Sequence, residues 1–226
     1  MILRRSTIAA ALVLAATSCT SESTDQPVSE MCSHPRTSAE GKLVQELLGT
    51  EKYETTIRNT NSDLAEKMNE HLREWQPGSS AFKIQTCAIS PEAPGTSGGN
   101  TLRTDFYWTS REDPEPSGRP ADTHSYYNLN GVYGESDETL ARLRIECDMP
   151  GDLGKPSKRT LLGADSSNTA YVGTEMNQEA RDRQIHFLYL MARQATDALG
   201  CENEPLKKAP VVKGYKTPEE AAKATP

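Results

Sequence analysis

The string Gly95-Thr96-Ser97-Gly98-Gly99 fits the pattern G-x-S-x-G, in which a serine acts as a nucleophile. Such a serine needs a buried strand before it and a helix after it, so that a strained turn presents its hydroxyl group. Here Pro91 and Pro94 precede the string, and Asn100 leads into an expected strand. We therefore predict an ordinary loop and no catalytic serine.

The histidines also lack a catalytic or metal-binding spacing. They are His34, His71, His124 and His186. No two of them stand four residues apart, as zinc ligands on one helix face do. We expect His71 and His186 to be structural residues within helices. His124 lies beside Tyr126 and Tyr127, a cluster that either packs on a sheet, which we favour, or contacts a ligand.

Three acidic residues lie close together in a proline-containing segment, Glu112, Asp113 and Glu115. They lack the spacing of a calcium-binding loop, so we interpret them as part of a solvated acidic loop. The chain also has no phosphate loop and no dinucleotide fingerprint. The sequence therefore predicts no metal site and no cofactor, and its motifs indicate no enzyme active site.

Cysteine is the remaining residue type that could bind a metal or form a covalent cross-link. The chain has five: Cys19, Cys32, Cys87, Cys147 and Cys201. The last four are widely spaced and include no C-x-x-C pair, which argues against zinc. An even number of cysteines in an exported chain predicts two disulfides, although the spacing leaves all three pairings open.

The first 18 residues predict export. Arg4 and Arg5 precede a short apolar stretch, residues 8–16, and small residues follow, which is the order of a secretory signal. The stretch is too short to cross a bilayer as a helix. Ala16-Thr17-Ser18-Cys19 looks like a bacterial lipobox, which implies that Cys19 is lipidated and becomes the mature N-terminus. The alternative is an ordinary cleaved signal beside an incidental cysteine.

The composition narrows the range of partners. The formal net charge of the 226 residues is −7, and it becomes −9 once the positive charges of Arg4 and Arg5 are removed with the signal. An acidic surface repels phosphate backbones, so we expect no nucleic acid as a partner. We expect contact with the membrane through the lipid anchor, at its extracytoplasmic face, rather than through a basic patch.

The chain divides into few parts. Residues 1–18 are the signal peptide, residues 19–31 form a lipidated cysteine and a flexible tether, and residues 206–226 are a polar tail that we expect to be disordered. Residues 32–205 then form one domain. Three helices are expected, over 38–48, 62–75 and 175–199. We expect Thr37 and Glu40 to cap the first, and Asn61 or Ser62 the second.

Strands are expected between these helices. Alternation of apolar and polar residues indicates them at 82–88, 102–108, 126–129 and 140–147; residues 53–57 are a strand or an extended link, and 169–172 are less regular. The fold class is therefore α+β, with a central antiparallel sheet packed by N-terminal helices and one long C-terminal helix. One strand turns Arg103, Asp105 and Tyr107 to its polar face, and another has Arg142 and Arg144 on its polar face.

Large aromatic residues are expected in the core. Phe106 and Trp108 share the apolar face of one strand, and Trp75 ends the second helix. Aromatic side chains between a sheet and helices usually fill the core. A binding groove is the alternative for these three residues.

Several of these features together resemble small actinobacterial lipoproteins of unknown function. They are the lipobox, the tether, a cysteine shortly before the Leu47-Leu48-Gly49 helix end, a strand cysteine, and Leu199-Gly200-Cys201 before a proline-containing tail. The resemblance implies an extracytoplasmic α+β domain with Cys32 bonded to Cys87 and Cys147 to Cys201. It assigns a functional role to Cys19 alone, as the lipid site.

Taken together, the sequence predicts a non-enzymatic binding or interaction module at the cell envelope. Its partner would be an envelope protein or a small ligand. The alternatives are an envelope hydrolase, with carboxylates that sequence cannot pair, and a structural spacer whose exposed feature is its acidic loops.

Overall fold

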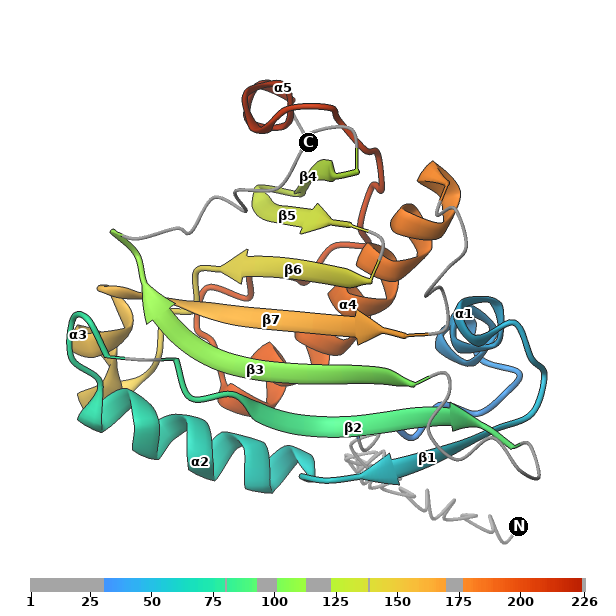
Figure 1. The fold of residues 1–226 in the computed structure, drawn as a ribbon. Coiled ribbons are helices and arrows are strands. Elements are labelled where there is room, and N and C mark those ends of the chain that lie inside the picture. Colours follow the sequence, from blue (N-terminus) through green and yellow to red (C-terminus); the bar gives the residue numbers. More distant parts are fainter. Residues whose placement is uncertain are drawn as a thin grey trace, which may run out of the picture.

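A computed structural model describes residues 31–79, 81–92, 101–112, 123–137, 139–169 and 177–224. Seven strands form one antiparallel sheet in the order β1-β2-β3-β7-β6-β5-β4, with the long helix α4 behind it (Figure 1). This confirms the α+β class. The elements are α1 (Ala39–Leu48), β1 (Tyr53–Ile57), α2 (Asn61–Glu74), β2 (Ile84–Pro91), β3 (Leu102–Ser110), β4 (Ser125–Leu129), β5 (Val132–Ser136), β6 (Leu140–Ile145), a 3₁₀ turn (Gly151–Leu153), α3 (Gly154–Ser157), β7 (Thr160–Asn168), α4 (Gln178–Leu199) and α5 (Pro218–Lys223).

The predicted helices form, with different caps. Ser38 caps α1 by accepting a hydrogen bond from the backbone N–H of Gly41, so the expected pairing of Thr37 with Glu40 is wrong. Thr60 caps α2 in a capping box with Asp63, so the cap lies just before Asn61 and Ser62, the residues that we expected to cap this helix. In both cases the cap is the residue whose extended backbone lets its hydroxyl reach the third N–H of the helix.

Helix α4 supplies one side of the core. Its apolar residues recur at helical spacing and include Ile185, Leu188, Ala192 and Ala195, all fully buried. The helix packs on β5, β6 and β7 and also contacts α1 and α2. Asn177 caps its start, and Gly200 ends it in the left-handed conformation that glycine adopts without a steric cost.

Strand β2 departs from simple alternation. Its register against β3 shifts between Gln85 and Cys87, which is a β-bulge. The bulge turns Ala88 away from the buried face that Ile84 occupies, so the simple alternation expected over 82–88 is wrong. Phe82 lies before the strand begins and its side chain is 61% exposed.

Two disulfides connect distant parts of the fold. Cys32 is bonded to Cys87 in β2, and Cys147, just after β6, is bonded to Cys201, just after α4. These are the two pairs that the resemblance implies. Met31, which we placed in the flexible tether, is fully buried, and its backbone N–H donates to Asn61.

The C-terminal residues differ from the expected disordered tail. The backbones of Tyr215 and Tyr126 exchange two hydrogen bonds, of 2.8 and 2.9 Å, which adds one bridge to the outer edge of β4. The short helix α5 follows and lies beside β4 (Figure 1). Ala221 is 1% exposed, and the side-chain amide of Asn128 donates to the carbonyl oxygen of Ala224. These contacts give the polar tail a fixed place on the edge of the sheet.

The face of the sheet opposite α4 carries polar and charged side chains. We call it the outer face. In the described parts of the chain, the helices that pack on β3, β5, β6 and β7 all do so from the α4 side (Figure 1). No helix in those parts is long and apolar enough to span a membrane.

Candidate functional site

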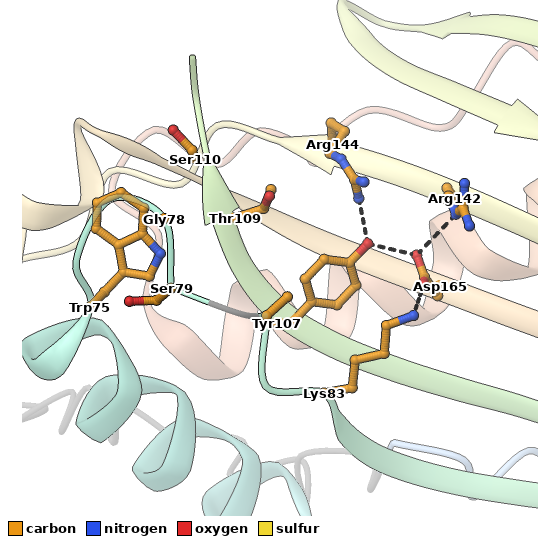
Figure 2. Close-up of a pocket in the computed structure, with 11 residues that line it drawn as sticks. Trp75, Gly78, Ser79, Lys83, Tyr107, Thr109, Ser110, Arg142, Arg144 and Asp165 are labelled. Atoms are coloured by element: carbon orange, nitrogen blue, oxygen red, sulfur yellow. Dashed lines mark hydrogen bonds and ion pairs between the residues drawn. The ribbon is translucent and has the colours of Figure 1, made fainter. Parts of the chain in front are cut away.

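The charged residues of the outer face converge on its centre. We call Lys83, Tyr107, Arg142, Arg144 and Asp165 the outer-face site (Figure 2). The antiparallel register places Tyr107 of β3 and Arg144 of β6 on either side of Gly163 in β7. In the next row, Asp165 of β7 lies opposite Arg142 of β6. Residues far apart in sequence therefore meet because their strands are neighbours.

Asp165 is the buried anion at the centre of this site. Its side chain is 2% exposed. Lys83 Nζ lies 2.5 Å from Oδ2, the Tyr107 hydroxyl donates to Oδ1 at 2.9 Å, and Arg142 Nε lies 3.9 Å from Oδ1. A carboxylate buried in this way needs such partners, because its desolvation is otherwise costly.

Glycine 163 allows Tyr107 to lie flat on β7. A Cβ atom at this position would stand only 2.5–3.0 Å from three atoms of the Tyr107 ring, which is 4% exposed. The absence of a side chain at Gly163 thus leaves room for the ring. The hydroxyl of that ring accepts a hydrogen bond from Arg144 Nη1 at 2.5 Å and donates a hydrogen bond to Asp165 Oδ1. Arg144 is held in place by Tyr107 rather than by a carboxylate.

The charges of the other two cations are balanced. Lys83 pairs with Asp165, and Arg142 Nη1 lies 3.1 Å from Glu135, which is nearly buried. Burial opposes the charge of Arg142, but Asp165 and Glu135 outweigh it and raise its pKa. Burial, with Asp165 next in effect, raises the pKa of Tyr107, so this hydroxyl stays protonated and acts as a donor.

Arg144 is different. Within the described ranges, no carboxylate lies within ion-pair distance of its guanidinium; its contacts there are the hydroxyl and the ring of Tyr107. The side chain is half-buried, so its charge is only partly hydrated. An incompletely hydrated guanidinium with free donors is a strong site for an oxyanion.

A cavity of about 280 Å³ opens over this arginine (Figure 2). It is lined by the charged residues of the outer-face site, by Trp75 on the opposite side, and by hydroxyl-bearing residues. The complete lining is Trp75, Gly78, Ser79, Ala81, Lys83, Tyr107, Thr109, Ser110, Arg142, Arg144 and Asp165. The cavity thus joins three cations to one carboxylate.

Comparison with protein-family models, with curated proteins and with solved structures found no match to this chain. What this site can bind must therefore be inferred from its geometry.

Apart from Trp75, the candidate site residues that the sequence singled out lie away from this cavity or outside the described residues. Cys19, Ser97 and Asp113 belong to the latter group. His71 is in α2 and stacks on Phe82 with ring centres 4.4 Å apart, and His186 is in α4. Over the described part of the chain, no three His, Cys, Asp or Glu residues come together as metal ligands would.

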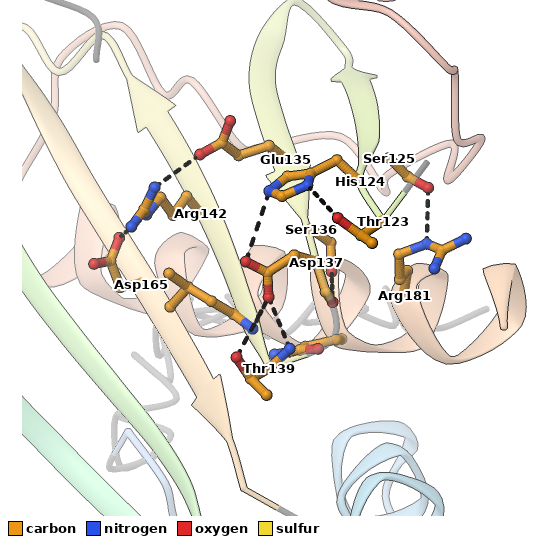
Figure 3. Close-up of polar contacts among 12 residues, drawn as sticks. Thr123, His124, Ser125, Glu135, Ser136, Asp137, Thr139, Arg142, Asp165 and Arg181 are labelled. Atoms are coloured by element: carbon orange, nitrogen blue, oxygen red, sulfur yellow. Dashed lines mark hydrogen bonds and ion pairs between the residues drawn. The ribbon is translucent and has the colours of Figure 1, made fainter. Parts of the chain in front are cut away.

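His124 is buried and has a carboxylate on one side and a hydroxyl on the other (Figure 3). Asp137 Oδ2 lies 3.7 Å from Nε2, and Thr123 Oγ1 lies 3.2 Å from Nδ1. The first distance is too long for a hydrogen bond. The other oxygen of Asp137 accepts from the backbone N–H groups of Thr139 and Leu140, as an aspartate that fixes a turn does. We assign this group a structural role, as the packing interpretation of His124 predicts.

Sequence reasoning did not single out the outer-face site. One signal for it was present, because Tyr107, Arg142 and Arg144 were expected on the polar faces of their strands. Asp165 gave no such signal, because β7 was not expected. Lys83 fell within the strand expected over 82–88 but was not singled out, and in the structure it lies just before β2. Of the three aromatics, Phe106 and Trp108 are buried as predicted, whereas Trp75 is only partly buried and lines the cavity.

Proposed function

We propose that this protein is a lipid-anchored binding module on the extracytoplasmic side of the cell membrane, and that its outer-face site takes up a small anionic ligand. The observation that carries the ligand class is Arg144, a half-buried cation that lines a polar cavity and has no carboxylate partner among the described residues. Small-molecule sites are typically concave, with a few convergent polar groups that fix orientation.

The neighbouring charges support this assignment. Asp165 and Glu135 neutralise Lys83 and Arg142, so these two cations hold the site together while Arg144 keeps its donors for a ligand. The acidic net charge of the whole chain has little influence at this point. At physiological ionic strength, exposed charges are screened over about 8 Å, so the groups that line the cavity dominate.

The anion site can be tested with Arg144→Gln. We expect binding of acetate and of inorganic phosphate, measured by calorimetry or NMR titration, to weaken about tenfold or more, because a charge-assisted hydrogen bond contributes about 1.5–3 kcal/mol. Arg103→Gln is the matched control: this exposed arginine is on β3 of the same face but does not line the cavity. Equal binding by the parent and Arg144→Gln would contradict the proposal. Chemical alteration of a bound ligand would instead favour the hydrolase alternative.

Two features support the location. Ala16-Thr17-Ser18-Cys19 gives a site for lipid attachment, and two disulfides suit an oxidising compartment. A diacylglyceryl group supplies two acyl chains, which anchor stably where one does not.

For the anchor, we expect Cys19→Ser to move the protein from the membrane fraction to the soluble fraction, because the thiol that carries the lipid is gone. Intact mass should show the lipid on the parent and not on the variant. Cys32→Ser, which removes a thiol assigned to a disulfide, is the control and should remain with the membrane. Membrane retention of Cys19→Ser with unchanged processing would rule out lipid attachment at this residue.

A further inference from the structure

Trp75 lines the cavity opposite its charged side (Figure 2). The residue follows the last turn of α2, where its extended backbone ends the helix. Gly78 then takes a left-handed conformation, with φ of +82°, and the chain turns so that Ser79 also lines the cavity. Trp75 packs against the core at one side, which fixes the position of the indole.

Hydroxyl groups line the space between the indole and the cations. They belong to Ser79, Thr109 and Ser110. The Ser110 hydroxyl accepts from the backbone N–H of Glu112. The side chains of Ser79 and Thr109 make no hydrogen bond to any described residue, so both are available to a ligand. A purely apolar ring would leave these hydroxyls without partners, which costs binding energy.

These three features together specify a ligand. An indole face packs well on the C–H groups of a sugar ring, since the negative face of the π-system attracts the weakly positive hydrogens. Free hydroxyls pair with sugar hydroxyls, and an unpaired guanidinium binds a carboxylate. The volume of about 280 Å³ is near the lower end of ligand pockets, which run from roughly 300 to 1,000 Å³, and suits a single ring.

Building on the proposed anion site, we propose that the ligand is an acidic sugar. Its carboxylate meets Arg144, its ring stacks on Trp75, and its hydroxyl groups bond to Ser79 and Thr109. The arrangement demands both a charge and a polyhydroxylated ring, so neither a neutral sugar nor a bare aromatic acid satisfies every group of the cavity.

The test compares four probes on the intact protein: glucuronate, glucose, benzoate and acetate. Glucuronate should bind at least tenfold more tightly than each of the others. Glucuronate binding no tighter than acetate, or weaker than benzoate, would overturn the acidic-sugar proposal while leaving the anion site intact. If no anion binds, or if Arg144→Gln has no effect on any of them, the proposed function itself fails.

Variants of Trp75 distinguish the acidic-sugar proposal from the anion-site proposal. Trp75→Leu should weaken glucuronate binding about tenfold and acetate binding by much less, because acetate has no ring to contact the indole. Phe82→Leu is the matched control, because this exposed aromatic residue lies beside Trp75 but does not line the cavity. An equal loss of acetate and glucuronate binding in Trp75→Leu would contradict the stacking role.

Fluorescence gives a readout that does not depend on the stability of Trp75→Leu. The chain has two tryptophans, and Trp108 is buried with its indole N–H donating to the carbonyl oxygen of Met68 at 2.8 Å. A fluorescence change on adding glucuronate should therefore come from Trp75. Trp75→Phe should retain binding within about threefold and lose the fluorescence response. A response that persists in Trp75→Phe would overturn the placement of the sugar ring.

Discussion

Replacing both Cys147 and Cys201 with serine should lower the free energy of unfolding by about 4 kcal/mol. The two cysteines are 54 residues apart, and in the chain-entropy model a cross-link over that distance removes this much freedom from the unfolded chain. The bond also joins the end of β6, which carries Arg142 and Arg144, to the end of α4. Denaturation by urea, followed by circular dichroism, measures the loss.

The second disulfide provides the comparison. Cys32 and Cys87 are 55 residues apart, so their double serine variant should lose a similar amount. Reduction of the parent should lower stability by more than either variant alone. A loss below about 1 kcal/mol in both variants would show that the unfolded chain is already compact, or that strain offsets the entropic gain.

Gly163→Ala should destabilise the protein by about 3 kcal/mol and weaken anion binding. Its new Cβ would overlap the Tyr107 ring, and overpacking of a buried site costs about 1–3 kcal/mol. Displacement of the ring would also break the hydrogen bonds from Arg144 to Tyr107 and from Tyr107 to Asp165. Arg144 would then lose the group that holds it in place. Thermal unfolding and acetate titration report the two effects.

A double-mutant cycle tests whether overlap with the Tyr107 ring causes the destabilisation by Gly163→Ala. In a Tyr107→Ala background the overlap is absent, so Gly163→Ala should cost less than about 1 kcal/mol there. Tyr107→Phe removes the hydroxyl and keeps the ring, and it separates the hydrogen bonds from the packing. If Gly163→Ala cost the same in both backgrounds, the close approach of ring and backbone would not be the reason.

The strand with Arg142 and Arg144 was predictable, because its residues alternate between buried and partly exposed positions. The long C-terminal helix was also predictable, from apolar residues at helical spacing such as Ile185, Leu188 and Ala192. Their apolar residues recur at the period of the element, and that period is visible in sequence. Strand β7 gives the opposite case. It is central, and Asp165 on its polar face is as buried as Leu162 on its apolar face. Burial on both faces removes the alternation by which a strand is recognised.

The site was out of reach of sequence reasoning for a related reason. Lys83, Tyr107 and Asp165 meet through strand order and register, and neither is encoded locally. The bulge in β2 is a second example, since nothing near Gln85 marks a shift of register. The helix starts were missed only narrowly, because several neighbouring Ser, Thr and Asn residues compete for each cap and backbone conformation decides among them.

The ordered C-terminal segment has a consequence for the membrane-anchored state that we propose. Without Tyr215 and its neighbours, β4 would present unpaired amide and carbonyl groups, a template on which adjacent copies stack. The chain's own end occupies that position. If the protein is anchored as we propose, copies crowded in the plane of a bilayer would then meet without pairing through their β4 edges.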